Sequence, residues 1–250
     1  MNNNLLEVKN LSKIYHSKEK ELLALKDINF SIKNGEFISI VGPSGCGKST
    51  ILSIISNMMD KSSGEIIFNK KDPEIGYMLQ EDSLFPWKTV LDNACLGLEI
   101  KKKLNKETKN NTIKLLEKYG LKDFINSYPD SLSGGLKQRV ALIRTLALNP
   151  DILLLDEPFS ALDYQTRLTL SDDLKKIITN ERKTAIMVTH DIAEAISMSD
   201  RVIVLSNRPA QVKEIIDISL NKKASPTENR NDKNFTKYYE MIWKELDHHV

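Results

Sequence analysis

The segment GPSGCGKST, residues 42–50, decides the expected fold. The apolar run EFISIV (36–41) before it is typical of a buried strand, and GKSTILSIISNMM (47–59) predicts a helix. In a loop of the pattern G-x-x-x-x-G-K-[ST], backbone N–H groups surround a nucleotide phosphate, the Lys reaches the β- and γ-phosphates, and the Ser hydroxyl faces Mg²⁺. A glycine-rich turn without a ligand is the alternative, and the flanking elements argue against it. The loop residues expected to contact the nucleotide are Gly42, Pro43, Ser44, Gly45, Cys46, Gly47, Lys48, Ser49 and Thr50.

Three other apolar runs also end in reactive side chains. Asp156 and Glu157 follow the first, His190 follows the second and Gln80 follows the third. Because ligands of open parallel sheets bind beyond the carboxyl ends of the strands, these side chains and Lys48 are expected to meet at one edge. Taken singly, an Asp-Glu pair can be a helix cap and a His can be a structural residue. Together they offer a carboxylate for a metal, a carboxylate for water and a polar group for the γ-phosphate, which predicts nucleotide hydrolysis.

The order of the remaining elements predicts an α/β fold. After residue 150, strand and helix patterns alternate, which indicates a mostly parallel sheet with helices on both faces. Residues 5–33 are typical of short antiparallel strands, and residues 89–148 predict a helical insert. Residues 221–234 predict a loose polar linker to a short helix that ends near Leu246. The other expected strands are 64–69, 75–80, 152–157, 184–190 and 201–206, the other expected helices are 164–180 and 191–198, and the expected domain is 1–220, followed by a tail, 221–250.

The composition limits the class of protein. The chain has 250 residues, of which 28% are charged, and a formal net charge of +2, so no overall attraction to nucleic acid or anionic lipid is expected. Cys46 and Cys95 provide no disulfide framework and fit a reducing compartment. No run approaches the roughly 18 apolar residues of a membrane span. We therefore expect a soluble intracellular chain, with any membrane part supplied by another polypeptide. Cys46 lies near Lys48 at a helix start, where a reactive thiolate is favoured.

A second phosphate-binding pattern lies in SLSGGLKQRV, residues 131–140. Ser133 is placed as a helix cap, and Gly134 and Gly135 would let a ligand approach the backbone. The free N–H groups at the start of a helix attract anions. One chain thus carries two candidate phosphate sites, with most of the helical insert between them.

Six motifs occur in the order found in the nucleotide-binding domain of an ABC transporter, which residues 5–217 resemble. They are the loop 42–50, Gln80, LSGGLKQRV (132–140), ILLLDE (152–157), SALD (160–163) and His190. The resemblance implies a P-loop NTPase fold of the ABC ATPase type, with a mostly parallel core sheet, an N-terminal antiparallel β subdomain and a helical insert. It also implies ATP and Mg²⁺ as ligands. Where the family signature usually reads LSGGQ, position 136 is Leu.

The same resemblance implies roles for individual residues. Glu157 is expected to be the general base and His190 to contact the γ-phosphate, with Lys48 as the third catalytic residue. Tyr15 is expected to stack on adenine. Two copies are expected to pair head to tail around ATP, because the helical insert keeps the two phosphate sites of one chain apart. The residues implied to hold Mg²⁺ are Ser49, Gln80 and Asp156, and those implied to contact the partner subunit's ATP are Ser133, Gly134, Gly135 and Asp163.

Further segments resemble the importer ATPases of the nitrate/sulfonate/taurine group. They are residues 80–93, 156–167 and 188–209 together with the short C-terminal tail. The resemblance implies a small solute of that kind, an integral-membrane permease, an extracytoplasmic solute-binding protein that acts indirectly, and a place at the cytoplasmic face of the cell membrane. Importers of other small solutes, such as a thiamine-precursor pyrimidine, stay open. A non-transport ABC ATPase also stays open, although the chain has neither a long coiled coil nor a second cassette.

The loop after Gln80 contains a candidate docking surface. Phe85 and Trp87 are aromatic residues in a loop, where exposed aromatics often mark a binding surface. A partner helix laid in an apolar groove is a common way to grip such anchors. We expect Phe85, Trp87 and Leu91 to receive a cytoplasmic helix of the permease. The alternative is that Trp87 packs into the helical insert.

Overall fold

A six-stranded sheet forms the centre of the computed structural model, which describes residues 4–16, 20–221 and 224–247. Its strand order is β5-β6-β7-β3-β8-β9, with the first five strands parallel and β9 antiparallel at the edge. β3, β6 and β7 are buried along their whole length, as expected of parallel strands covered on both faces. The strands are β5 (Ile75–Met78), β6 (Ile152–Asp156), β7 (Thr184–Val188), β3 (Phe37–Val41), β8 (Arg201–Leu205) and β9 (Val212–Asp217).

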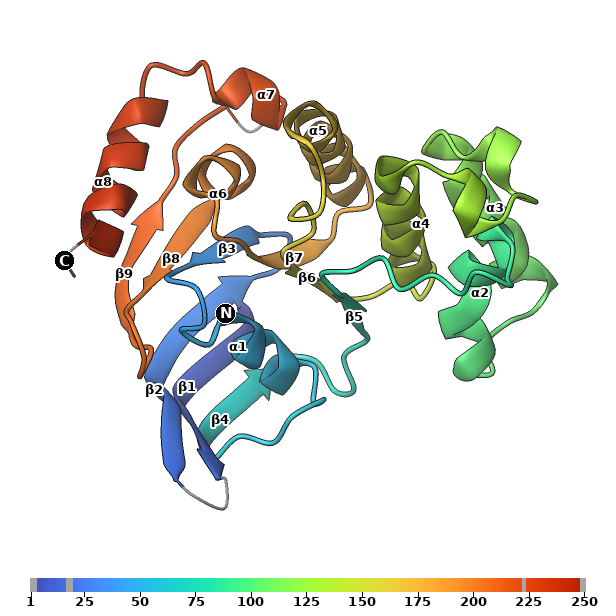
Figure 1. The fold of residues 1–250 in the computed structure, drawn as a ribbon. Coiled ribbons are helices and arrows are strands. Elements are labelled where there is room, and N and C mark those ends of the chain that lie inside the picture. Colours follow the sequence, from blue (N-terminus) through green and yellow to red (C-terminus); the bar gives the residue numbers. More distant parts are fainter. Residues whose placement is uncertain (1–3, 17–19, 222–223, 248–250) are drawn as a thin grey trace.

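A second, antiparallel sheet has the order β2-β1-β4 (Figure 1). Its strands are β1 (Asn4–His16), β2 (Glu21–Lys33) and β4 (Ser63–Phe68). The helix α1 (Lys48–Ile55) packs between the two sheets, because Ile51 and Leu52 share one apolar cluster with Leu6 of β1 and Ile40 of β3. Both sheets therefore help to fix the start of α1, which is the end of the glycine-rich loop.

The segment 89–148 is largely helical and extends to the right in Figure 1. It contains α2 (Val90–Ile100), α3 (Lys106–Lys118), the short helices η1 (Lys122–Phe124) and η2 (Pro129–Ser131), and α4 (Gly134–Leu146). Thr89 caps α2, and Asn105 forms a capping box with Thr108 at the start of α3. Val140 of α4 shares an apolar cluster with Leu153 of β6, so α4 joins this helical region to the core sheet.

The helices α5 (Tyr164–Asn180) and α6 (Ile192–Met198) cover the face of the core sheet opposite α1 (Figure 1). The expected boundaries of α5 agree with the structure because Asp163 caps its first turn by accepting from the Thr166 N–H. The predicted fold class, a mostly parallel core sheet with an antiparallel N-terminal sheet and helices, is confirmed. No helix within the described ranges combines the length and apolar character that a bilayer crossing requires.

The tail differs from the loose linker expected for 221–234. Residues 222 and 223 lie outside the described residues, but α7 (Pro226–Asn229) forms with a capping box between Ser225 and Glu228. The Thr227 N–H donates to Asp172 at 2.9 Å, and the Asn229 side-chain amide donates to the Ser197 carbonyl at 3.0 Å. These hydrogen bonds attach α7 to α5 and α6, and composition alone does not reveal them.

The last helix, α8 (Phe235–Asp247), closes a third apolar cluster. Its Ile242 is fully buried against a set that includes Ile196 of α6, Val204 of β8 and Ile216 of β9. The C-terminal tail is therefore part of the folded core.

Replacing Ile242 by Ala should lower the free energy of unfolding by about 2–5 kcal/mol, because a buried aliphatic side chain is removed from a packed cluster. The exposed neighbour Lys244 supplies the control, since Lys244→Ala should change stability by no more than about 0.5 kcal/mol. Urea unfolding followed by circular dichroism measures both. Equal stabilities of the two variants would show that α8 does not belong to the core.

Candidate functional site

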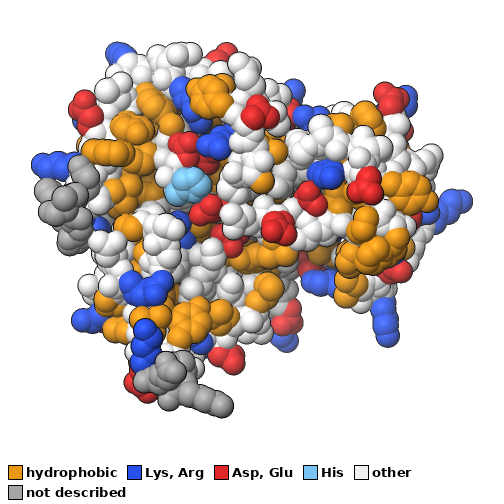
Figure 2. All heavy atoms as spheres, viewed as in Figure 1, with side chains coloured by type: hydrophobic (Ala, Val, Ile, Leu, Met, Phe, Trp, Pro, Cys, Tyr) orange, Lys and Arg blue, Asp and Glu red, His pale blue; other side chains and the backbone are white. Residues whose placement is uncertain are grey.

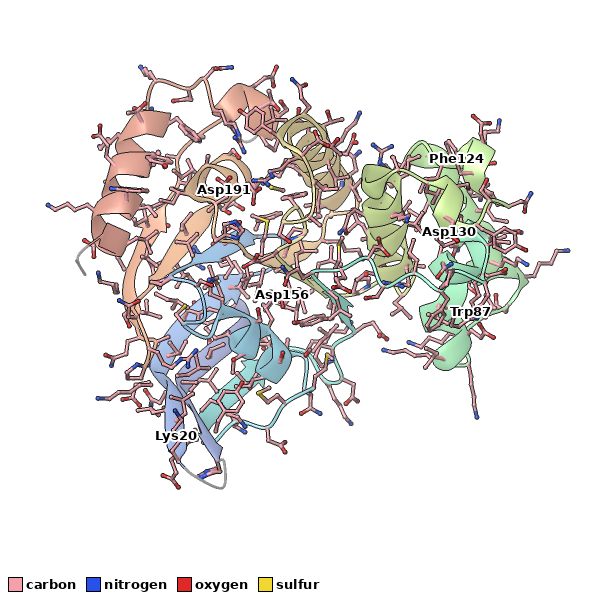
Figure 3. All side chains as sticks on the ribbon, viewed as in Figure 1. Lys20, Trp87, Phe124, Asp130, Asp156 and Asp191 are labelled. Atoms are coloured by element: carbon pink, nitrogen blue, oxygen red, sulfur yellow. The ribbon has the colours of Figure 1, made fainter. Side chains whose placement is uncertain are left out.

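The predicted reactive residues gather where the parallel strands end. β7 lies between β6 and β3, with Val188 paired to Asp156 on one side and to Ile40 on the other. The glycine-rich loop follows β3, Glu157 follows β6 and His190 follows β7. Figure 3 shows Asp156 at the centre of the molecule, close to α1. The expectation of one shared edge agrees with this topology.

The loop 42–50 is held around its lysine. The Lys48 ammonium is buried and donates to the carbonyls of Gly42 at 2.9 Å and Pro43 at 3.0 Å. Gly47 has φ of 125° and lies so close to β2 that a Cβ atom would stand 2.7 Å from a methyl group of Leu25. Only glycine fits there, because other residues rarely adopt this φ and the contact is with a packed side chain. The loop thus presents a fixed cation and its backbone N–H groups to a phosphate.

The buried carboxylate of Asp156 has a different donor on each oxygen. Ser49 donates to Oδ1 at 2.8 Å, and Tyr77 donates to Oδ2 at 3.0 Å. Burial raises the pKa of Asp156, against the effect of these two hydrogen bonds, and burial also raises the pKa of Tyr77 to about 12. The sequence does not single out Tyr77, because an aromatic residue inside a strand pattern cannot be distinguished from an ordinary core residue.

Oxygen donors of this kind suit Mg²⁺. A hydroxyl from Ser49 and a carboxylate from Asp156 are hard ligands, and Mg²⁺ usually takes only one or two protein carboxylates together with waters and phosphate oxygens. The site fits a metal that arrives with a nucleotide.

Glu157 and His190 are in contact. The His190 Nδ1 atom lies 3.1 Å from Glu157 Oε2, and both side chains reach solvent to some extent. Glu157 has φ of 45°, while its N–H donates to the Val188 carbonyl at 2.9 Å. Positive φ is uncommon for residues other than glycine, and such strained backbone is concentrated at functional sites. The pair is thus accessible and fixed at the strand end.

Gln80 connects the site to the helical region. Its side-chain amide donates to the Ser160 hydroxyl at 3.3 Å, in the segment after Glu157. The Gln80 carbonyl accepts from the amide of Gln138 at 3.4 Å. Gln138 is a buried residue of α4 that the sequence analysis did not single out, and its Oε1 has no hydrogen-bond partner among the described residues. α4 and Gln80 are therefore in direct contact.

The second candidate phosphate site occupies the first turn of α4. Ser133 caps the helix by accepting from the Leu136 N–H at 3.4 Å, and both Ser133 and Gly134 are exposed. At Gly135 a Cβ atom would stand 2.9 Å from a methyl group of Thr166 in α5, so close packing requires glycine. Asp163 is engaged as the cap of α5, and its hydrogen bond from Thr166 holds its pKa below the ordinary value. The contact of these site residues with a partner's ATP stays a prediction; they are Ser133, Gly134, Gly135 and Asp163.

Tyr15 lies beside the glycine-rich loop. Its hydroxyl is 3.0 Å from the Thr50 hydroxyl of α1 and 3.3 Å from the sulfur of Met59. The ammonium of Lys13 stands 5.3 Å from the centre of the Tyr15 ring. Tyr15 is thus near enough to the loop to meet a nucleotide base, and adenine stacking stays a prediction.

The loop before α2 exposes two stacked aromatic rings. Trp87 is 70% exposed and Phe85 37% exposed, with ring centres 5.0 Å apart and nearly parallel planes. Leu91 is half-buried against the core cluster. The alternative that Trp87 packs into the helical region is wrong.

Buried Asn93 fixes the loop, because its side chain accepts from the Phe85 N–H at 2.8 Å and donates to the Phe85 carbonyl at 3.1 Å. Figure 2 shows apolar side chains gathered over this part of the molecule.

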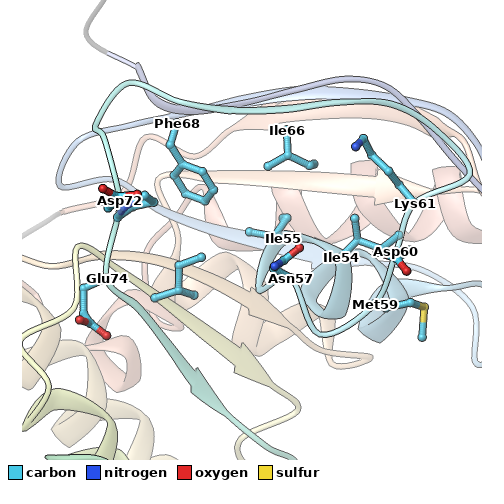
Figure 4. A pocket seen from close by; sticks show the side chains of 12 residues that line it. Ile54, Ile55, Asn57, Met59, Asp60, Lys61, Ile66, Phe68, Asp72 and Glu74 are labelled. Atoms are coloured by element: carbon cyan, nitrogen blue, oxygen red, sulfur yellow. The ribbon is translucent and has the colours of Figure 1, made fainter. Parts of the chain in front are cut away.

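A cavity of about 770 Å³ lies at the other end of α1 (Figure 4). Ile54, Ile66 and Phe68 contribute apolar walls, and Asp60 and Asp72 contribute carboxylates. None of the predicted site residues lines it. It is therefore separate from the reactive edge of the sheet.

Comparisons with known proteins agree with this geometry. Residues 25–160 match the family described as ABC transporter. The chain is 45% identical over 248 residues to an uncharacterized ABC transporter ATP-binding protein, YtlC, of Bacillus subtilis, covering 97% of this chain and 95% of that protein. It is 36% identical to the aliphatic sulfonates import ATP-binding protein SsuB of Bacillus thuringiensis, covering 97% and 96%.

A solved structure has the same fold. It is a dimeric, post-hydrolysis state of the ATP-binding cassette MJ0796 bound to ADP and phosphate. The similarity has a TM-score of 0.72 at 35% identity, and covers 86% of this chain and 99% of that chain.

The expected reactivity of Cys46 is wrong. Its thiol is only 2% exposed, and burial raises its pKa more than the nearby Lys48 lowers it. Burial likewise raises the pKa of Cys95. Position near a cation and a helix start favours the thiolate, but the loss of hydration in the core outweighs both.

We expect alkylation of Cys46 by iodoacetamide at pH 7 to be at least roughly tenfold slower in the folded protein than in urea, because the thiolate is the nucleophile and the sulfur is shielded. Because the pKa of Cys46 is raised, the alkylation rate should increase only at pH values above the pKa of an ordinary thiol. Mass spectrometry of a Cys95→Ser variant isolates the signal. Fast labelling at neutral pH that MgATP suppresses would instead support an activated thiol.

Proposed function

This chain belongs to the ABC transporter family as an ATP-binding, ATP-hydrolysing subunit, and from that premise we propose that it drives the import of a small solute. The solute is of the nitrate/sulfonate/taurine kind, and it passes through a separate permease. Relatives named as aliphatic sulfonate import subunits, which match this chain over nearly its whole length, support this choice. The contact of Glu157 with His190 beside the phosphate loop is the single observation that carries the catalytic assignment.

The arrangement suggests a division of labour in hydrolysis. Lys48 and the loop N–H groups hold the β- and γ-phosphates, and Glu157 orients a water molecule and accepts its proton as the water oxygen attacks the γ-phosphorus. The bond between the γ-phosphorus and the bridging oxygen of the β-phosphate breaks at the same time, so that ADP and inorganic phosphate are the products. His190 contacts the γ-phosphate and, through its 3.1 Å contact, keeps Glu157 in place. Ser49, Asp156 and Gln80 would hold Mg²⁺, which neutralises charge on the phosphate oxygens.

Two copies are proposed to close around two ATP molecules. Ser133, Gly134 and Gly135 of one copy would contact the ATP held by Lys48 of the other. The start of α4 supports this, because Ser133 and Gly134 are exposed and the cap by Ser133 engages the Leu136 N–H. The N–H groups of Gly134 and Gly135 take no part in that cap and have no partner within the helix, so they can meet an anion that comes from outside the chain. A similar cassette is dimeric in its solved structure.

The permease is proposed to dock on Phe85, Trp87 and Leu91 at the cytoplasmic face of the membrane, with the extracytoplasmic solute-binding protein acting only through the permease. A rigid pair of exposed rings is a suitable anchor, since little side-chain entropy is left to lose on binding. Gln80 lies in the same segment and contacts both Ser160 and Gln138. Movement of this loop would therefore displace residues at the sheet edge where the nucleotide phosphates are expected to bind.

Glu157→Gln should retain ATP binding and reduce hydrolysis by about 10²–10⁴-fold, because the amide keeps the size of the side chain but cannot accept a proton. With hydrolysis blocked, the variant should elute as a dimer in gel filtration with ATP. The exposed Glu214 of β9 supplies the control, and Glu214→Gln should behave like the wild type. Near-normal turnover by Glu157→Gln would exclude it as the base.

Trp87→Ala should weaken assembly with the permease by at least about 2 kcal/mol, or roughly 30-fold, because a central aromatic anchor is lost. Nucleotide binding by the isolated subunit should be unchanged. The matched control is Trp243→Ala, since Trp243 is also exposed, at 51%, and stacked on a neighbouring ring, Tyr239. Co-purification with the permease and solute uptake measure the effect. Loss of ATP binding by Trp87→Ala alone would overturn the docking proposal.

A further inference from the structure

Tyr77 places a phenol against the carboxylate of Asp156. Its strand, β5, runs parallel to β6, with Tyr77 paired to Leu154, two residues before Asp156. The Tyr77 hydroxyl donates to Asp156 Oδ2 at 3.0 Å. The same strand leads to Gln80 three residues later. Tyr77 thus contacts Asp156, one residue expected to hold Mg²⁺, and precedes another, Gln80, along the chain.

The two hydrogen-bond donors to Asp156, Ser49 and Tyr77, differ in whether they are also expected to bind Mg²⁺. Ser49, on Oδ1, belongs to the phosphate loop and is itself an expected ligand of Mg²⁺, so its hydroxyl oxygen would face the metal when a nucleotide binds. Tyr77, which donates to Oδ2, is not an expected ligand of Mg²⁺, so it can keep its hydrogen bond when the metal and nucleotide bind. A buried carboxylate needs such a partner, because its charge is poorly hydrated. Asp156 thus has, on Oδ2, a donor that lies outside the phosphate loop.

We propose that Tyr77 is a positioning residue for the metal–nucleotide complex: its hydroxyl holds the Asp156 carboxylate in the orientation that Mg²⁺ requires. This inference rests on the proposed function, since it assumes that Asp156 serves the metal. Groups that hydrogen-bond to metal ligands typically contribute about 10–100-fold to metal affinity or activity. Tyr77 would act in this way without touching the metal.

A purely structural role makes a different prediction. The Tyr77 ring packs, half-buried, on the apolar cluster that contains Ile51 and Leu52 of α1. If the residue only supported α1, its loss would weaken nucleotide binding equally with and without Mg²⁺, because the phosphate loop would be disturbed in both cases. Tyr77→Phe keeps the ring and removes only the hydroxyl. Comparison of the two conditions thus separates positioning from packing.

The chain provides a matched control in Tyr119. Its hydroxyl also donates to a carboxylate, that of Glu181, at 2.6 Å. Tyr119 stands at the end of α3, and neither residue of this pair belongs to the predicted site. Tyr119→Phe thus removes the same kind of hydrogen bond from another part of the molecule.

The experiment measures ADP binding by calorimetry over a series of Mg²⁺ concentrations and in EDTA. For Tyr77→Phe, the half-saturating Mg²⁺ concentration should rise about 10–100-fold, while ADP affinity in EDTA stays within about twofold of the wild type. Tyr119→Phe should match the wild type in both conditions. A thermal unfolding scan establishes that both variants are folded, which is expected because each keeps its ring packing.

Two results would overturn the inference alone: an unchanged Mg²⁺ dependence of Tyr77→Phe, or an equal loss of affinity with Mg²⁺ and in EDTA. A wild-type protein that binds ADP without any effect of Mg²⁺ would overturn the proposed metal site, and the inference with it. The wild-type titration and the variant comparison thus keep the two failures apart.

Discussion

Parallel pairing of β5, β6, β7 and β3 is the constraint on which the rest of the site depends. Strands that run in the same direction end at the same edge, so four segments far apart in the sequence deliver their polar residues to one place. β3, β6 and β7 are buried along their whole length, and Asp156 stands at the last position of β6. Glu157 and His190 follow the ends of β6 and β7, whereas Tyr77 lies within β5. Moving any one strand by a residue would separate Lys48, Asp156 or His190 from the others.

Hydrogen bonds between these segments turn proximity into a connected site. Asp156 joins the phosphate loop to β5 through Ser49 and Tyr77. Gln80 joins β5 to the segment after Glu157 and, through Gln138, to α4. Since α4 also begins with the second candidate phosphate site, the two ends of the expected ATP interface are linked by a few short contacts.

Much of the fold follows from local sequence rules, and the misses have physical causes. The bounds that the strand and helix alternation predicts for helix 164–180 agree with α5, whose first turn Asp163 caps. The loop 42–50 was recognised because its spacing is set by phosphate geometry. Tyr77 was not, since its role depends on a neighbouring strand. Cys46 was misjudged because charge can be read locally, whereas burial depends on the whole fold. The segment 221–234, expected to be a loose linker, is attached to α5 and α6 by hydrogen bonds of Thr227 and Asn229, and such contacts also depend on the whole fold.

Both tryptophans of the chain, Trp87 and Trp243, lie at the surface, one on the loop before α2 and the other on α8. These two elements stand at opposite sides of the molecule in Figure 1. The tryptophan fluorescence of this protein therefore originates at two peripheral surfaces rather than in the core, and it is a poor measure of unfolding. With Trp243 replaced by Phe, the remaining tryptophan emission comes from Trp87 alone. The protein thus carries its own optical probe at the surface where a membrane partner is expected to bind.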